Sequence, residues 1–426
     1  MSMLSGRGNR NVDELGVPWR FARRTTYDSE TNPEGMISFA TAEQLLMGKE
    51  LEELANKIHI PAEAFTYKYS TAGGERFPKA LARFLNEWFG PWEEVEAEDV
   101  KITAAATALH ECLGFALADP GEGVLMSRPY YGRFELDFGN KAGVKVIAAD
   151  TQAEDCFQVG VVEKYEEALK KAEGEGVRIR VLLVVNPHNP LGRCYPKETL
   201  ISLMRFCQTH SLHFISDEVY ALSVFDSGEP SVHPFTSVLA INPTDIIDRN
   251  LVHVTYAMSK DFGSAGLKLG ALITKNHDLK RALLANVRFH GSSGPSLTIA
   301  SAMLEDHEWC RNFIILSRQR LADVYKYVTS RLGQMGIKYL AGSNAGFFIW
   351  IDLSPWFPPE SEGLADRERE QMLAQKFVDR GVFLQPGEEH ALKCGWFRVV
   401  FSMERRVVEE GLRRINKVLK NIGKWD

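Results

Sequence analysis

The chain has 426 residues, with 45% hydrophobic and 25% charged residues and a formal net charge of −6 from 50 Lys and Arg against 56 Asp and Glu. This composition excludes collagen-like, disordered and disulfide-scaffold proteins, and the length predicts about two or three compact units. Apolar runs such as residues 181–185 are far shorter than the roughly 20 residues of a membrane helix, and a slightly acidic chain is a poor general nucleic-acid binder. We therefore expect neither a membrane nor a nucleic-acid partner.

Helical and strand-like patterns alternate through the first 300 residues. Apolar residues at three- and four-residue steps predict an amphipathic helix over 75–89, and a second helix is expected over 196–210. The predicted strands cover residues 124–126, 144–148, 179–185, 214–216 and 251–255. Because several of these runs are apolar at consecutive positions, they predict an α/β fold whose mostly parallel sheet is covered by helices on both faces.

The pattern changes after about residue 300. A long helical stretch, residues 301–332, leads to a strand candidate at 345–352, and apolar residues between 407 and 419 predict a terminal helix. A Pro- and acid-rich stretch at 354–370 predicts a surface insertion. We interpret residues 301–426 as a small α+β C-terminal domain, 66–300 as the large ligand-binding domain, and 1–65 as an N-terminal arm that packs on the small domain.

Six cysteines occur in the chain, with no C-x-x-C pair and no histidine cluster at zinc spacing. The first thirty residues contain no apolar signal core. In a chain of this length we expect reduced, mostly buried thiols, a cytoplasmic location and no metal site. The cysteines are Cys112, Cys156, Cys194, Cys207, Cys310 and Cys394.

Polar side chains follow three of the predicted strands. Residues 179–185 run into a Pro-rich stretch that contains Asn189, the next strand runs into a segment with Asp217 and Tyr220, and the last runs into a segment with Lys260. Taken singly, the asparagine could form a turn, the aspartate could cap a helix and the lysine could be solvated. Since ligands collect at the carboxyl ends of parallel strands, we expect the four side chains to meet in one crevice.

Pyridoxal 5'-phosphate is a ligand that needs these four side chains together. Its aldehyde forms a Schiff base with a lysine, its ring nitrogen needs an acidic partner, and its ring oxygen needs hydrogen-bond donors. Lys260 suits the aldehyde, Asp217 the nitrogen, and Asn189 and Tyr220 the oxygen. The sequence therefore predicts pyridoxal 5'-phosphate as the cofactor.

At these motifs the chain resembles the fold-type I class I/II aminotransferase family, in particular the branch of the 1-aminocyclopropane-1-carboxylate synthases. The resemblance runs from Asn-Pro-Glu-Gly at 32–35 to Phe-Arg-Val at 397–399, and it is strongest at 186–192, 217–220 and 259–270. These motifs are specific for a fold and a cofactor and not for one reaction. The resemblance implies a type I transferase large domain and a homodimer.

The resemblance also assigns residues to the cofactor. It makes Lys260 the Schiff-base lysine, and it places the backbone of Ala106 and Thr107, at the start of a helix, against the phosphate. Tyr131 is the aromatic residue that stacks on the pyridine ring, with Tyr130 as the alternative one position away.

For the substrate, the resemblance makes Arg398 the residue that binds the α-carboxylate and places Glu43 nearby. Two positions depart from the family. Ala257 stands where a hydroxyl is usual, and Lys268 stands where an arginine usually contacts the phosphate. Lysine keeps the charge and loses the planar fork, so we expect Lys268 to hold the phosphate less rigidly. Lys268 is also the alternative anchor for the cofactor aldehyde.

The expected activity is that of a pyridoxal-phosphate enzyme in which Lys260 also removes the Cα proton of an α-amino acid. Transamination is favoured. A carbon–sulfur lyase that acts by β- or γ-elimination, or ring closure of the cyclopropane-synthase kind, is the alternative because Glu43 and the synthase-like frame are present. A non-catalytic relative that kept the fold is the second alternative.

Overall fold

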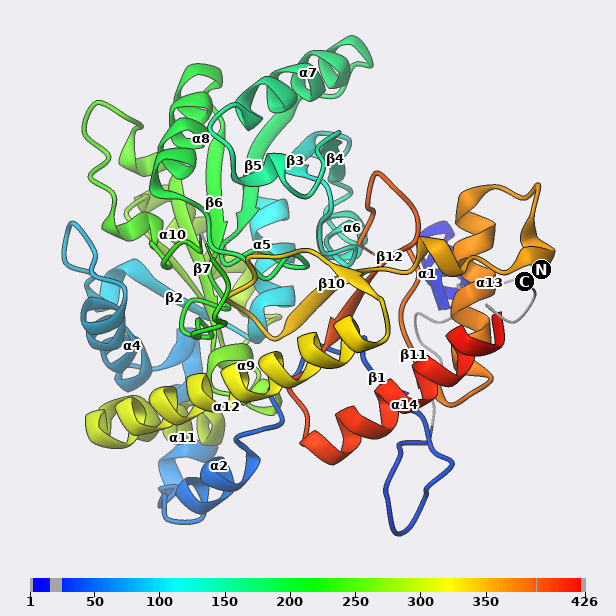
Figure 1. Cartoon of the computed structure of the whole chain (residues 1–426). Helices are drawn as coiled ribbons and strands as arrows, with labels where there is room; N and C mark the ends of the chain where they lie inside the picture. Colours follow the sequence, from blue (N-terminus) through cyan, green and yellow to red (C-terminus); the bar gives the residue numbers. More distant parts are fainter. Residues whose placement is uncertain (1–2, 16–24, 231, 388, 423–426) are drawn as a thin grey trace.

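The computed structural model describes residues 3–15, 25–230, 232–387 and 389–422. Its centre is a seven-stranded sheet with helices on both faces (Figure 1). Of the described strands in this sheet only β8 runs opposite to the others. The predicted α/β fold with a mostly parallel sheet is therefore confirmed. The spatial order is β2 (Val100–Thr103), β8 (Gly270–Thr274), β7 (Val252–Ala257), β6 (His213–Asp217), β5 (Ile179–Val185), β3 (Gly123–Ser127) and β4 (Lys145–Ala149).

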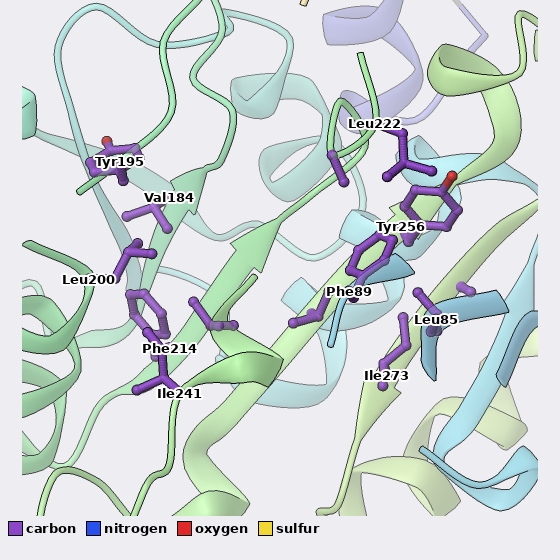
Figure 2. Packing of buried hydrophobic residues seen from close by; sticks show 14 of the residues in the cluster. Leu85, Phe89, Val184, Tyr195, Leu200, Phe214, Leu222, Ile241, Tyr256 and Ile273 are labelled. Atoms are coloured by element: carbon purple, nitrogen blue, oxygen red, sulfur yellow. The ribbon is translucent and has the colours of Figure 1, made fainter. Parts of the chain in front are cut away.

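Strand β5 shows why both faces of the sheet are covered. Its odd-numbered residues from Val181 to Val185 belong to one buried cluster, and Leu182 and Val184 belong to a second. Figure 2 shows part of the second cluster, in which Val184 lies beside Leu200 and Phe214. The first cluster includes residues of α5 (Ala105–Leu117), α6 (Phe134–Gly139) and α10 (His277–Val287); the second includes residues of α4 (Arg76–Trp88), α7 (Val161–Gly174) and α8 (Lys197–His210).

The elements predicted before residue 300 are present with small shifts of their ends. The helix expected over 75–89 is α4, the one expected over 196–210 is α8, and the five expected strands are β3 to β7. Strands β2 and β8 were not predicted. Strand β2 has only four residues with a lysine among them, and the apolar run of β8 is only three residues long, between a glycine and a threonine.

The C-terminal part contains a three-stranded antiparallel sheet in the order β12-β10-β9. Strand β1, from the N-terminal segment, pairs in parallel with β11, so this segment is joined to the C-terminal part here. The division at residues 65 and 300 stays a proposal. The elements are β1 (Ile37–Ser38), β9 (Lys338–Tyr339), β10 (Phe348–Asp352), β11 (Val382–Phe383), β12 (Trp396–Val400), α12 (His307–Gln334), α13 (Asp366–Val378) and α14 (Arg405–Ile422).

Two expectations for this part need correction. The helical stretch 301–332 belongs to two helices, because α11 (Gly294–Glu305) ends before Asp306, whose side chain accepts the backbone N–H of Trp309 and caps α12. The stretch 354–370 is not wholly a surface insertion. Its last residues begin α13, where the buried Glu370 accepts the N–H of Gly395 at 2.7 Å.

The remaining helices are short and lie near the ends of the chain or beside the sheet. No helix in the described ranges is long and apolar enough to cross a membrane. The six cysteines are free thiols, and all except Cys394 are buried. The remaining short α-helices are α1 (Gly6–Leu15), α2 (Gly48–Ala55), α3 (Tyr67–Ser70) and α9 (Met258–Asp261).

Arg414 of α14 fastens the N-terminal segment beside β1. Its guanidinium donates to the carbonyl oxygens of Pro33 at 2.7 Å, Gly35 at 2.8 Å and Gly381 at 3.0 Å, and to the carboxylate of Glu410 at 2.7 Å. The side chain is only 9% exposed. Hydrogen bonds from a charged donor to buried carbonyls contribute more than exposed ion pairs do.

We expect Arg414→Met to lower the free energy of unfolding by about 2–3 kcal/mol, because the carbonyl oxygens of Pro33 and Gly35 lose the charged donor and that of Gly381 keeps only the N–H of Ile37. Denaturant unfolding measures this loss. The matched control is Arg413→Met, since Arg413 pairs with the same Glu410 and is 63% exposed, and it should cost about 1 kcal/mol or less. Equal losses in the two variants would contradict the tethering role of Arg414.

Candidate active site

A cavity of about 370 Å³ lies where β5, β6 and β7 end. Val185, Asp217 and Ala257, the last residues of these three strands, line it. The convergence expected from the sequence is therefore observed, and the residues predicted for the site all face this one cavity. They are Glu43, Ala106, Thr107, Tyr131, Asn189, Asp217, Tyr220, Lys260, Lys268 and Arg398.

Lys260 lies in the short helix α9 that follows β7, and its amine reaches the cavity. Its Nζ donates to the carbonyl oxygen of Ala42 at 2.6 Å. Burial, with a further contribution from the positive charge of Arg398, lowers the pKa of Lys260 to about 8. A larger fraction of this amine than of an ordinary lysine amine is therefore unprotonated and nucleophilic near neutral pH.

Asp217 ends β6 and is buried. Burial raises the pKa of its carboxyl group, while the neighbouring His110 acts in the opposite direction. Oδ1 accepts a hydrogen bond from the hydroxyl of Thr255 at 2.9 Å, and Oδ2 lies 3.6 Å from Nε2 of His110. A positively charged ligand nitrogen beside this carboxylate would hold it in the ionised form.

His110 and Asp137 were missed by the sequence analysis. Nδ1 of His110 lies 3.2 Å from Oδ2 of Asp137, so the imidazole stands between two buried carboxylates. Burial disfavours the imidazolium, but the hydrogen bond with Asp137 and the charge of Asp217 outweigh it and raise the pKa of His110. Its position three residues after Thr107 on the same helix was the available signal, whereas nothing in the sequence indicated Asp137.

Asn189 and Tyr220 present donors to the cavity. The side-chain oxygen of Asn189 accepts from Nη1 of Arg398 at 2.7 Å, so its amide nitrogen is the end available to a ligand. Burial raises the pKa of Tyr220 far above the ordinary value, so its hydroxyl stays protonated. Its ring is fixed by edge-on contacts with Phe347 and Phe348. Both residues suit an anionic ring oxygen.

The N-terminus of α5 forms another wall of the cavity. Within the described chain no side chain caps this terminus, so its first backbone N–H groups lack a capping acceptor, and Ala106 and Thr107 at this terminus line the cavity. Ala105 has a φ of +73°, and Lys268 adds a positive charge to the same cavity. Free N–H groups at a helix start and a nearby cation suit a phosphate.

Gly270 allows the chain to pass close to this turn. A Cβ at Gly270 would lie 2.5 Å from the carbonyl carbon of Ala105 and 2.9 Å from the nitrogen of Ala106. The close passage of β8 therefore determines where the turn can lie.

Ser259, which the sequence analysis did not single out, also lines the cavity and brings a hydroxyl two positions after Ala257.

Arg398, on β12, reaches the cavity from the C-terminal part. It is buried and lies 5.7 Å from the centre of the Phe348 ring. Nη2 donates to the carbonyl oxygen of Ala40 at 2.9 Å, while the buried Nε has no hydrogen-bond partner in the described part of the chain. An unpartnered buried N–H on a guanidinium suits a ligand carboxylate.

Of the two neighbouring tyrosines, Tyr131 lines the cavity and Tyr130 does not. Tyr131 packs edge-on against Phe134 at a centroid distance of 5.4 Å. Tyr130 instead donates its hydroxyl to Glu135 at 3.0 Å. Glu43 lies at the cavity rim together with Arg133 and Gln385, two polar residues that the sequence analysis missed because no motif marks them.

Together these donors and charges fit pyridoxal 5'-phosphate. The nucleophilic amine of Lys260 suits its aldehyde, and the buried carboxylate of Asp217 suits its protonated ring nitrogen. The start of α5 suits its phosphate. The fit rests on a lysine with a lowered pKa and on a helix start without a capping side chain.

Comparison with known proteins agrees with this fit. The family described as "Aminotransferase class I and II" matches residues 50–415. A "probable aminotransferase" of Leptosphaeria maculans is 32% identical over 98% of this chain and 98% of its own length. The human "1-aminocyclopropane-1-carboxylate synthase-like protein 1" is 33% identical over 98% of this chain and 83% of its own length.

Among solved structures, an aspartate aminotransferase from Thermus thermophilus with maleate has the same fold. Its TM-score is 0.76, and the match covers 98% of this chain and 100% of that chain at 20% sequence identity.

We expect Gly270→Ala to weaken the affinity for pyridoxal 5'-phosphate about tenfold to a hundredfold, because the new methyl group displaces the turn at Ala105. Titration of the cofactor absorbance measures this affinity. Gly266→Ala is the control, since a Cβ there has no heavy atom within 4 Å, and it should bind the cofactor like the parent protein. Equal affinities in the two variants would refute the close-passage argument.

The lowered pKa of Lys260 has a testable consequence in the cofactor-free protein. The amine is protonated and unreactive below about pH 8 and becomes reactive as the pH rises through that value. Labelling with trinitrobenzenesulfonate, followed by peptide mapping, should therefore give a midpoint near pH 8, about two units below the value of about 10.4 that is usual for a lysine in water. A midpoint at the usual value would mean that the cavity does not lower the pKa of Lys260.

Proposed function

The chain belongs to the aminotransferase class I and II family, and from this premise we propose that this pyridoxal-phosphate-dependent enzyme transfers the amino group of an α-amino acid to a keto acid. The observation that carries the proposal is the joint presence of Lys260, Asp217 and Arg398 around one cavity. Each of these groups matches a different requirement of amino-group transfer: a nucleophilic amine, a partner for the ring nitrogen and a site for a carboxylate.

When bound, pyridoxal 5'-phosphate supplies an aldehyde that takes up amino groups and a charged ring that withdraws electrons from the substrate Cα. In the proposed roles, Asp217 holds the proton on the ring nitrogen, and the charged ring nitrogen together with His110 favours the ionised carboxylate against the effect of burial. Asn189 and Tyr220 donate to the ring oxygen. The backbone of Ala106 and Thr107, with Lys268, binds the phosphate, and Tyr131 covers the ring.

On the substrate side, Arg398 binds the α-carboxylate and thereby orients Cα toward the amine of Lys260. That amine, which has a pKa of about 8, removes the Cα proton and delivers a proton back at a different carbon. Glu43 at the rim is proposed to contact the rest of the substrate. Transfer of a proton between two carbons by one amine is the step that distinguishes transamination from elimination.

The alternatives are weaker on these observations. Elimination or ring closure needs a leaving group on the substrate side chain, whereas the roles assigned above concern the amino group, the Cα proton and the α-carboxylate. Several relatives are named for cyclopropane-carboxylate synthase, so elimination is retained as an outcome of the test. Loss of catalysis is disfavoured because Lys260, Asp217 and Arg398 are all present.

We further propose that the enzyme is a cytoplasmic homodimer. The support for a second copy is a set of aromatic side chains exposed to solvent, namely Phe65 at 74%, Tyr67 at 95% and Phe289 at 79%. Phe289 directly precedes His290, whose carbonyl oxygen accepts the N–H of Ala104 at the start of the proposed phosphate turn. Exposed aromatic surface of this kind is typical of interfaces. The free thiols support a reducing compartment.

The proposed reaction is tested by mixing the cofactor-loaded enzyme with a panel of α-amino acids without an amino acceptor. We expect one equivalent of keto acid per site, conversion of the cofactor to its amine form, and further turnover only after a keto acid is added. Lys260→Ala should give none of these signals. Repeated release of ammonia without an acceptor would support elimination, and an unchanged cofactor spectrum with every amino acid would contradict catalysis.

A further inference from the structure

A carboxylate of the chain itself lies against Arg398. Oε1 of Glu389 is 3.1 Å from Nη1 of Arg398, and both side chains are only 7% exposed. Glu389 lies before β12 and outside the motifs that the sequence analysis identified. Arg398 is the proposed binding site of the substrate α-carboxylate. In the structure, a carboxylate of the chain itself lies against this guanidinium.

The contacts of Arg398 leave part of its guanidinium open. Nη1 donates to Asn189 at 2.7 Å and faces Glu389, and Nη2 donates to the carbonyl oxygen of Ala40 at 2.9 Å. Nε is buried and makes no hydrogen bond within the described residues. A ligand carboxylate that binds end-on, through two parallel hydrogen bonds from Nη1 and Nη2, takes the place that Glu389 occupies at Nη1.

Hydrogen bonds hold the carbonyl oxygens of Glu389 and of His390, which follows it. The N–H of Tyr130 donates to the carbonyl oxygen of Glu389 at 2.9 Å. The His390 ring stacks on Tyr130 at 4.8 Å, and Nη1 of Arg128 donates to the carbonyl oxygen of His390 at 2.9 Å. These contacts attach Glu389 to the segment that also carries Tyr131 of the cavity wall.

Two carboxylates at one buried guanidinium repel each other, and a buried guanidinium with no counter-ion is unfavourable. In the ligand-free protein Glu389 is the counter-ion of the buried guanidinium. When a ligand carboxylate binds, Glu389 repels it. Ligand binding therefore includes the cost of moving Glu389 away from Arg398.

We propose that Glu389 is an internal counter-ion of Arg398 that competes with ligand carboxylates and so determines how tightly the site holds them. This inference rests on the role of Arg398 in the proposed function. A carboxylate without an amino group gains only the contact with Arg398 and is held weakly. An α-amino acid meets the same competition but has a second attachment through its amine, so it is still held, whereas a keto-acid product is released more readily.

The test uses the cofactor-loaded enzyme and 3-phenylpropionate, a carboxylate without an amino group, with Kd measured by calorimetry. Glu389→Gln keeps the size of the side chain and removes its charge, and it should tighten binding about tenfold. The matched control is Glu404→Gln, because Glu404 is 62% exposed and pairs with Arg406 at 2.7 Å. It makes the same change in net charge and should leave Kd unchanged.

Arg398→Gln makes the test specific, because it should weaken binding and abolish the effect of Glu389→Gln in the double variant. Unchanged or weaker binding in Glu389→Gln, with weaker binding in Arg398→Gln, would overturn the counter-ion role and leave the proposed function intact. Unchanged binding in Arg398→Gln would instead count against Arg398 as the carboxylate site. If Glu404→Gln tightened binding as much as Glu389→Gln, the effect would come from the net charge of the protein. The counter-ion role of Glu389 would then be overturned.

Discussion

The burial of charged groups around one cavity is the constraint on which the rest of the site depends. A charge removed from water is stable only beside a partner or as a group with a shifted pKa. The structure uses both solutions: Asp217 faces His110, Arg398 faces Glu389, and the pKa of Lys260 falls to about 8. Such surroundings favour a ligand that brings a cationic ring nitrogen to one wall and a carboxylate to another.

The N-terminal segment completes this cavity with backbone groups. The carbonyl oxygen of Ala40 accepts from Arg398, and that of Ala42 accepts from Lys260. The same segment continues into the parallel pairing of β1 with β11 and into the contacts of Arg414. The orientation of the two cationic side chains thus depends on a stretch of chain that contributes few side chains of its own to the site.

The sequence was most informative where one local pattern decides the structure. Consecutive apolar residues such as Val181 to Val185 predicted buried parallel strands. The polar residues after these strands identified the cavity because the carboxyl ends of parallel strands lie at the same edge of the sheet. Contacts between distant segments carry no such pattern. The His110–Asp137 pair joins two helices, and Glu389 meets Arg398 across a loop, so neither contact could be predicted. The break at Asp306 was missed because apolar spacing continues on both sides of it.

The attachment of residues 33–35 to α14 has a consequence for how the molecule is made. During synthesis residues 33–35 leave the ribosome before the strands of the large sheet, and α14, which holds them, leaves after those strands. The large sheet has its strands before that moment, but the wall formed by Ala40 and Ala42 gains the contacts of Arg414 only when α14 has emerged. A nascent chain stalled before α14 would therefore have the strands of the sheet without the last contacts that hold this wall of the pocket.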